Sequence, residues 1–267
     1  MRGPEKLLKS ENNWETHMGG WFAGERVVYR GQDLHVDLKD MSWMELYVYG
    51  ITDRRFDERQ LKILNSIWTN TSYPEPRIWN NRVAALAGTA RSTATLSLGA
   101  AVSVSEASIY GHRPNIRAID FFWRAKRLLD QGHNLHAVVR GEIDKFRGIF
   151  GYGRPITRID ERIPHLMCLV EELGCAQGYF LKLAFEVEKI LIEDRLRLHM
   201  NITGLDAALT ADMGFSAREH HLFMTTCFLA GMPPCFIDAA EKDEGSLFPL
   251  HCGRIAYHGV AQRDWSR

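Results

Sequence analysis

Helical periodicity is the feature that most constrains this chain. Between Ser42 and Ala230, apolar residues recur three and four positions apart, the spacing of helices that bury one face. The expected helices begin at residue 42, run through 61–68 and 83–104, with a turn or kink at Gly88 or Gly99, and continue over 116–129, 163–173, 178–194, 202–213 and 217–230. This pattern predicts an all-α fold.

The two ends of the chain depart from this helical pattern. Residues 21–34 alternate apolar and polar side chains around Val27, Val28 and Tyr29 and then reach Gly31, which predicts a short strand or β-hairpin. We expect the polar residues 1–15 before it to be mobile. Residues 249–267 have few helical spacings and predict an arm.

Length and composition limit the class of protein. A chain of 267 residues can form one large helical core or two unequal lobes. Its 33 basic and 33 acidic side chains balance, which argues against a nucleic-acid partner. The longest apolar runs, such as 98–104 and 222–230, fall short of the roughly 18 residues that a membrane span needs, and the polar N-terminus lacks a secretory signal. We expect a soluble, cytoplasmic protein without a membrane partner.

The five cysteines do not indicate a metal site. Their number is odd and they lack the C-x-x-C spacing of zinc or redox sites, so most are expected to be reduced residues of the core. The cysteines are Cys168, Cys175, Cys227, Cys235 and Cys252. We assign no metal to the chain.

Several motifs occur in an order that resembles the citrate synthase superfamily, especially citryl-CoA lyase and the C-terminal lyase module of ATP-citrate lyase. Residues 150–158 (FGYGRPITR) and the following Asp160-Glu161-Arg162 are similar to that family's Gly-x-Gly-His loop and its Asp-Pro-Arg motif. Residues 185–189 (FEVEK) resemble its Glu-x-Glu-Lys helix, and 201–206 (NITGLD) resemble its Asn-Val-Asp-Gly segment. Residues 24–31 and 254–259 resemble its entry hairpin and closing arm.

The resemblance implies a fold and an assembly. It implies a citrate-synthase-like helical domain over 16–267, with a large lobe, a smaller lobe at roughly 145–215, a short N-terminal β-hairpin, and a C-terminal arm at 249–267. Enzymes of this family pack helices across a two-fold axis and complete each site with the partner's arm. We therefore expect a homodimer.

The family's acid–base residues are replaced in this chain. Its reaction needs a base beside the reacting carbon and a hydrogen-bond donor at the developing oxyanion. Arg154 stands where the family has its loop histidine, and it stays protonated, although it can still polarise a carbonyl or bind an anion. Thr203 stands at the catalytic aspartate, and Asp206, one turn later, is a possible substitute. Both also fit a capping role for the helix near Asn201.

A further catalytic histidine of the family falls in the segment 108–113 (SIYGHR). Ungapped alignment places Tyr110 there, and a shift of two residues places His112 there instead. Tyr110 is equally compatible with a buried aromatic residue, and His112 with a feature of the turn before the helix that Pro114 introduces. The catalytic candidates are therefore His112, Arg154, Thr203, Tyr110 and Asp206.

Arginines are the candidate anion-binding groups, because a planar guanidinium matches a carboxylate. Arg158 and Arg162 share one face if their segment is helical, and Asp160 and Glu161 could simply neutralise them. Arg254 in the closing segment and Arg113 beside His112 complete the substrate-binding candidates.

Arginine retention together with base replacement supports two alternative functions. The first is a lyase or transferase that makes or breaks a carbon–carbon bond between an acyl-CoA, or a related enolisable substrate, and a 2-oxo acid. Coenzyme A would then be a cosubstrate, with no tightly bound cofactor. The second is a catalytically inactive binding or regulatory protein that keeps the anion pocket and the dimer.

Overall fold

The computed structural model describes residues 3–13, 15–109, 111–154, 157, 159–246, 252–254, 256 and 258–261. The chain divides into two compact units: residues 1–72 with 106–227 form the first, and residues 73–105 with 228–267 form the second. Each unit is described by itself below. The smaller lobe predicted at 145–215 falls within the first unit, and its boundaries stay a prediction.

The first unit begins with a small antiparallel sheet. Its N-terminal elements are α1 (Pro4–Ser10), β1 (Gly19–Phe22), β2 (Arg26–Tyr29) and β3 (Gln32–Asp33), and the strand order is β1-β2-β3. Gly24 and Gly31 adopt φ angles of 75° and 78°, a left-handed backbone that glycine tolerates best. The expected β-hairpin is confirmed, and β3 extends it because Tyr29 pairs with Gln32 across the turn at Gly31.

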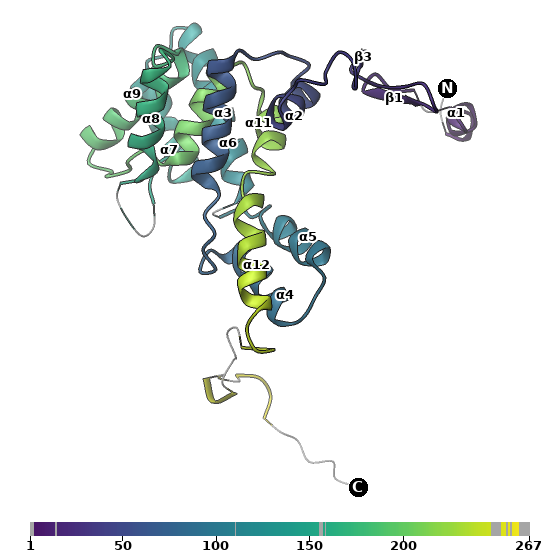
Figure 1. Cartoon of the computed structure of the whole chain (residues 1–267). Helices are drawn as coiled ribbons and strands as arrows, with labels where there is room; N and C mark the ends of the chain where they lie inside the picture. Colours follow the sequence, from purple (N-terminus) through teal and green to yellow (C-terminus); the bar gives the residue numbers. More distant parts are fainter. Residues whose placement is uncertain are drawn as a thin grey trace. The chain divides into compact units, whose positions relative to one another are not determined.

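Helices make up the rest of the first unit. They are α2 (Trp43–Thr52), α3 (Glu58–Thr71), α6 (His112–Asp130), α7 (Leu135–Phe146), α8 (Arg162–Glu172), α9 (Tyr179–Glu193), α10 (Ile202–Asp212) and α11 (Ala217–Met224). Side-chain oxygens of Ser42, Asp57 and Ser216 accept backbone N–H groups at the starts of α2, α3 and α11. Several of these helices run alongside one another (Figure 1), and the mainly helical fold is confirmed.

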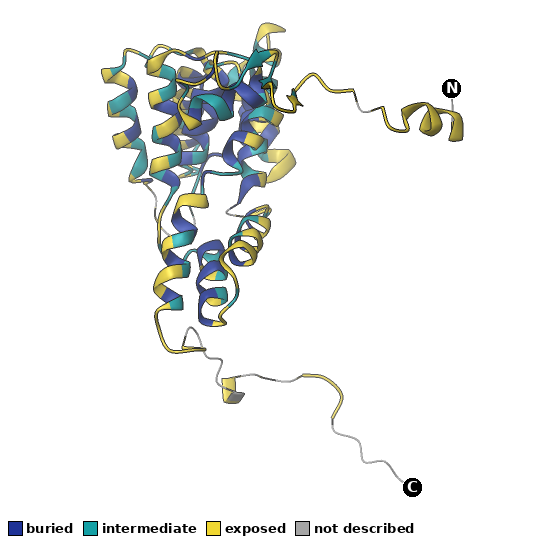
Figure 2. Ribbon diagram, turned by 45° about the vertical axis from the view of Figure 1, so that its right-hand side comes forward, coloured by how far each residue is buried: buried dark blue, intermediate teal, exposed yellow. Residues whose placement is uncertain are grey.

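Helix α10 forms the centre of this unit. It is buried continuously from Gly204 to Ala211 and packs against α6 and α9. A helix that is apolar on nearly all sides must be covered on all sides, which explains this position. Figure 2 shows the buried residues, in dark blue, on the inward faces of the surrounding helices. Asp206 and Thr210 are the polar exceptions on α10 within its buried stretch.

The second unit is a smaller helical group. Its elements are α4 (Trp79–Thr89), α5 (Ala94–Val104), the 3-10 turns η1 (Leu229–Gly231) and η2 (Cys252–Arg254), and α12 (Met232–Ala240). Helices α4 and α12 approach so closely that a Cβ at Gly88 would lie 2.5 Å from the carbonyl oxygen of Phe236. The predicted turn follows Gly88, whereas Gly99 continues α5 without a break.

Several predicted boundaries were wrong. Helix α6 begins at His112, four residues before the predicted start at Ile116, and Gly111 is its N-cap. The helix predicted for 217–230 ends at Met224 and is followed by a turn before η1. Helix α7 had no counterpart in the prediction. Its buried residues are only Val139 and Glu142, so its apolar stripe is too narrow to stand out in the sequence.

One stretch of the described chain is long and apolar enough, by length and composition alone, to cross a membrane. This stretch covers residues 217–240 and has a mean hydropathy of 1.4. It comprises α11, η1 and α12, and Phe223, Met224, Met232 and Cys235 are buried within the protein. Core helices of soluble proteins share this composition, so the stretch is weak evidence for a membrane span.

The cysteines fit the core prediction only in part. Cys227 and Cys235 are buried free thiols, whereas Cys175 is half-buried and Cys168 is exposed. The Sγ atom of Cys168 lies 3.3 Å from Glu172 on the solvent-facing side of α8. The expectation that most cysteines are core residues is therefore met by two of these four.

Candidate functional site

The glycine loop and the start of α10 are joined by backbone hydrogen bonds. The amide of Gly153 donates to the carbonyl oxygen of His199 at 2.6 Å, and the amide of Asn201 donates to that of Gly151 at 2.9 Å. The side-chain amide of Asn201 adds a bond of 2.8 Å to the carbonyl oxygen of Gly153. Two motifs far apart in the sequence therefore form one local structure in the first unit.

This junction needs two glycines. A Cβ at Gly204 would lie 2.5 Å from the carbonyl oxygen of Gly151, and one at Gly151 would lie 2.8 Å from the Cα of Gly204. Gly151 also adopts a φ of 98°, which L side chains rarely adopt. Both glycines are thus required by the close approach of the loop to α10.

Gly204→Ala should destabilise the protein by about 1–3 kcal/mol, because the added methyl forces the loop away from α10. The matched control is Gly141→Ala in α7, where an added Cβ meets nothing within 4 Å. That control should be neutral or stabilising by up to about 1 kcal/mol, since alanine is the better helix former. Urea unfolding of both variants measures the difference. Equal free energies of unfolding would disprove the close contact.

Asp160 is the buried hub of the site. Its Oδ1 accepts from Nε of Arg162 at 2.8 Å, and its Oδ2 accepts from Nη2 of Arg162 at 2.7 Å. Oδ2 also accepts from the amide of Ile202, the first residue of α10, at 2.9 Å. Burial alone would raise the pKa of Asp160, but Arg162 and the amide of Ile202 outweigh it and lower this pKa. The carboxylate thus ties the start of α8 to the start of α10.

Arg154 lies beside this hub. Its Nη1 is 3.2 Å from the carbonyl oxygen of Ile159, it forms an ion pair with Glu161, and it lies 3.7 Å from Oδ1 of Asp160. The Arg154 partner lowers the pKa of Glu161. The Arg154 side chain is 25% exposed. Arg154 is therefore ion-paired within the chain, and its anion-binding role stays a prediction.

Asp206 is a buried acid of the site. Neither of its buried carboxyl oxygens has a hydrogen-bond partner among the described residues. Burial raises its pKa well above the usual range; Arg162 opposes this effect and Asp160 adds to it. Burial therefore favours the protonated, neutral form of Asp206, which can give up a proton that an ordinary aspartate has already lost.

The capping alternative for α10 is wrong for Asp206. Asn201 is the N-cap, and its Oδ1 accepts from the amide of Gly204 at 3.3 Å. Asp206 lies a full turn inside the helix, where N–H groups are already paired. Thr203 is half-buried in the first turn.

Three histidines cluster near α10. His112 at the start of α6 is buried, and its ring lies 6.1 Å from that of His221 in an edge-on arrangement. Burial, and then His221, lower the pKa of His112 to about 4. His220 is fully buried, and burial, followed by His221 and His112, lowers its pKa to about 3. His112 and His220 are therefore neutral at physiological pH.

Sequence reasoning missed part of this site. It treated Asp160 only as a neutralising partner of arginine, and it did not consider His220 or His221. The adjacent histidines and the Asp160-x-Arg162 spacing were visible signals. Neither signal indicates burial, which is what distinguishes these residues.

The remaining predicted residues are exposed, belong to the second unit, or lie outside the described residues. Arg113 is exposed, and its Nη1 lies 3.2 Å from Oγ of Ser108. Arg254 belongs to η2 in the second unit. Tyr110 and Arg158 lie outside the described residues. Helix α8 begins at Arg162, and the helical face that Arg158 and Arg162 would share stays a prediction.

The described residues contain no cluster of three or more histidine, cysteine or acidic side chains that could hold a metal ion. In this part of the chain the three neighbouring histidines thus do not converge as ligands.

The first unit thus presents a glycine loop on the start of α10, a buried acid, and the buried histidines His112 and His220 with lowered pKa values. No protein-family model and no curated protein sequence matches the chain. Its fold, however, is that of the citrate-synthase-like proteins.

Three solved structures illustrate this similarity. Citryl-CoA lyase from Hydrogenobacter thermophilus matches with a TM-score of 0.83 at 18% identity, over 95% of this chain and 98% of that one. ATP citrate lyase from Methanothrix soehngenii, in complex with citrate and coenzyme A, matches at 0.73 and 18% identity over 98% of this chain and 45% of that one. Citrate synthase from Thermoplasma acidophilum matches at 0.64 and 15% identity over 85% and 59%. The predicted citrate-synthase-like helical fold is confirmed.

Proposed function

We propose that this protein is an enzyme that makes or breaks a carbon–carbon bond between an acyl-CoA, or a related enolisable substrate, and a 2-oxo acid. The single observation that carries the proposal is Asp206, a buried carboxylic acid without a partner among the described residues, one turn into a helix held by the glycine loop. Cleavage of such a bond leaves an electron pair on carbon, and a neutral acid can protonate it.

The neighbouring charges suit this chemistry. Asp160, which accepts from the first amide of α10, also holds Arg162 by hydrogen bonds. Arg162 is near enough to Asp206 to affect the pKa of Asp206. Arg154 lies on the outer side of Asp160. We assign Arg162 and Arg154, with Arg158, Arg254 and Arg113, to binding the substrate's carboxylates, and His112, Tyr110 and Thr203 to polarising the reacting carbonyl. An arginine matches a carboxylate through its planar fork.

Related folds point to the substrate class. A neighbouring structure is a citryl-CoA lyase, and another holds citrate and coenzyme A. We therefore propose citryl-CoA, or a close analogue, as the substrate, with coenzyme A as part of the substrate rather than a resident cofactor. We also propose a cytoplasmic homodimer, which light scattering at working concentration tests.

Incubation of the purified chain with citryl-CoA is the direct test. We expect acetyl-CoA and oxaloacetate to appear in equal amounts above the rate in protein-free buffer, followed by mass spectrometry. Release of free coenzyme A thiol without oxaloacetate would instead indicate thioester hydrolysis, and would contradict the proposal.

A catalytically inactive binding protein is the second candidate. It is favoured by the ion pairs that already hold Arg154 and Arg162 to carboxylates of the chain itself, and by the replacement of the family's base. Thermal stabilisation by citryl-CoA or citrate without any product would support this candidate over the enzyme.

A further inference from the structure

The hydrogen bonds around Thr210 fix the tautomer of His220. The Thr210 hydroxyl lies 2.8 Å from the carbonyl oxygen of Asp206, which can only accept, so the hydroxyl donates there. Its oxygen therefore accepts from Nδ1–H of His220, at 2.8 Å. A neutral imidazole with its proton on Nδ1 carries a lone pair on Nε2. This Nε2 atom is buried and has no partner among the described residues.

Asp206 supplies the complementary group. As a neutral acid, it carries a proton on a buried carboxyl oxygen that has no acceptor in the described part of the chain. Asp206 and Thr210 are four residues apart on α10, so their side chains share one face, about 5–6 Å apart at Cβ. His220 is bonded to Thr210 and thus lies on that face. Helix geometry and the Thr210 bond thus put a donor without an acceptor and an acceptor without a donor on the same face of α10.

Leaving such groups unpaired is costly. A buried polar atom without a hydrogen-bond partner destabilises the folded state. Further buried atoms without a partner among the described residues lie close by in sequence, namely Nδ1 of His221 and Oγ1 of Thr226. Clusters of this kind bind internal water, which bridges polar groups that do not touch.

A row of polar groups leads from this face toward solvent. His221 lies edge-on to His112, and its Nε2 lies 3.4 Å from Oε2 of Glu106, whose side chain is 45% exposed. The titratable and charged groups that face the pair are His112 from α6, Arg162 and Asp160 from the start of α8, His221 from α11, and Cys227 after it.

We propose that His220 is the proton partner of Asp206, with which it exchanges one proton through a water-bridged path inside the first unit. This role rests on the proposed function, in which Asp206 is the acid. His220 does not touch substrate and exchanges protons with the substrate and with Asp206 only through bridging water, so it is a relay residue.

The proton balance closes within one turnover of cleavage. The carbon–carbon bond breaks, and its electron pair takes the proton of Asp206, leaving a carboxylate. The substrate's hydroxyl becomes the carbonyl of the 2-oxo acid, and its proton passes through bridging water to Nε2 of His220. The imidazolium then returns one proton to the Asp206 carboxylate, which restores both groups. Opposite shifts of an acid and a base in one site are typical of such assignments.

The first test is independent of turnover. In the full chain labelled with ¹⁵N-histidine, one ring should keep Nδ1 protonated and Nε2 unprotonated from about pH 5 to about pH 8. Asp206→Ala should shift the Nε2 resonance of this ring, because the donor is lost. Asp120→Ala, at an exposed position of α6, should not. An Nε2-protonated ring, or a ring unaffected by Asp206→Ala, would overturn the pairing.

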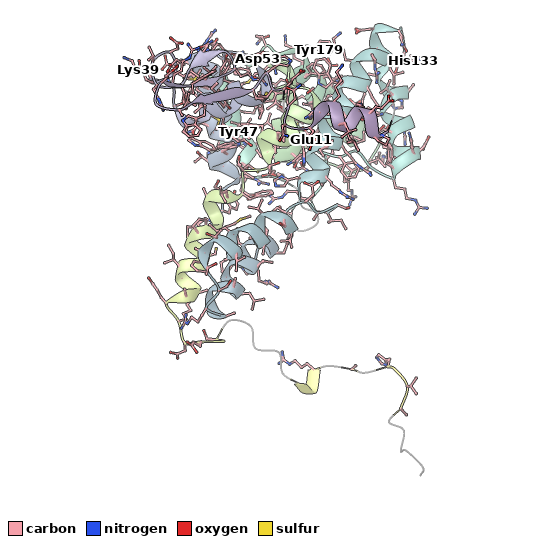
Figure 3. The ribbon with its side chains drawn as sticks, turned by 90° about the vertical axis from the view of Figure 1, so that its right-hand side faces the viewer. Glu11, Lys39, Tyr47, Asp53, His133 and Tyr179 are labelled. Carbon is pink, nitrogen blue, oxygen red and sulfur yellow. The ribbon has the colours of Figure 1, made fainter. Side chains whose placement is uncertain are left out.

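The second test uses citryl-CoA. His220→Asn keeps a donor toward Thr210 but removes the basic nitrogen, and should slow cleavage about 10²-fold or more. His133→Asn, at an exposed residue that Figure 3 labels at the edge of the first unit, should leave the rate unchanged. The double variant of Asp206→Asn and His220→Asn should be no slower than Asp206→Asn alone, since the two groups act as a unit.

The outcomes separate the relay from the proposed function. Wild-type protein that forms no product contradicts the proposed function, and the resonance experiment then decides the pairing alone. Wild-type protein that is active while His220→Asn cleaves at the same rate overturns the relay and leaves the function standing. If His220→Asn fails to fold, the pairing of His220 with Asp206 is tested by the Nε2 resonance in the Asp206→Ala variant.

Discussion

Asp206→Asn should slow the cleavage of citryl-CoA by about 10²–10⁴-fold and should also make the folded protein more stable at neutral pH. The first effect follows because asparagine has no proton to give. The second follows because asparagine removes a carboxyl group that burial keeps from ionising. Loss of activity with a gain in stability is the expected signature of a group kept for chemistry at a cost to folding.

The sign of the stability effect depends on pH. The unfolded chain ionises Asp206 near the ordinary pKa of about 3.9, whereas the folded chain holds the proton to a higher pH. Between these two values the folded state binds more protons, so this group's contribution to stability falls as pH rises, by up to about 1.4 kcal/mol per pH unit. Asp206→Asn removes that slope.

Urea unfolding of the wild type and Asp206→Asn at several pH values measures this effect. The stability difference should be near zero below about pH 4 and should grow in favour of the variant toward neutral pH. Asp130→Asn, at an exposed position of α6, should leave both turnover and unfolding close to wild type. A variant that is less stable at every pH would refute the buried neutral acid.

Asp160→Asn should have the opposite effect and destabilise the protein by about 3–5 kcal/mol at neutral pH. The substitution removes the charge that pairs with both Nε and Nη2 of Arg162, and leaves that guanidinium without its buried partner. It also weakens the acceptor for the amide of Ile202. The loss should be smaller in acid, because the wild type itself loses the stability of this pair as pH falls from the unfolded pKa of about 3.9 through the lowered folded pKa of Asp160.

Glu161→Gln is the matched control for Asp160→Asn. Glu161 also pairs with an arginine of the loop, but its side chain is 58% exposed, so its loss should cost less than about 1 kcal/mol. Urea midpoints at neutral pH give both values. Equal losses for the two substitutions would show that Asp160 is an ordinary surface partner and not the link between α8 and α10.

Local sequence signals predicted most of the fold. Helical spacing located most of the helices of the first unit. Helix α7 was missed because its buried Glu142 is held by Arg124, at 2.8 and 2.9 Å, and this pairing between helices leaves no local pattern. Helix α6 begins at His112, before the predicted start at Ile116. The prediction failed because proline is tolerated within the first turn of a helix as well as at its first residue.

The candidate site was less predictable than the fold. The motif around Arg154 and the position of Asp206 were recognised, but their roles depend on burial, which arises from packing. The bond from the amide of Ile202 to Asp160 spans 42 residues. The tautomer assigned to His220, and with it the proposed role of this residue, follows from its contact with Thr210, ten residues away. Separations of this kind are set by tertiary structure, so no sequence spacing reveals them.

The contact between Gly151 and Gly204 has a mechanical consequence. A Cβ built at Gly204 would lie 2.5 Å from the carbonyl oxygen of Gly151, so the two backbones are in direct contact. No compressible side chain separates the loop from α10 at this point. A ligand that presses on the loop therefore transmits its displacement to the helix that carries Asp206, instead of being absorbed by side-chain rearrangement. We therefore expect ligand binding at the loop to change the position of Asp206.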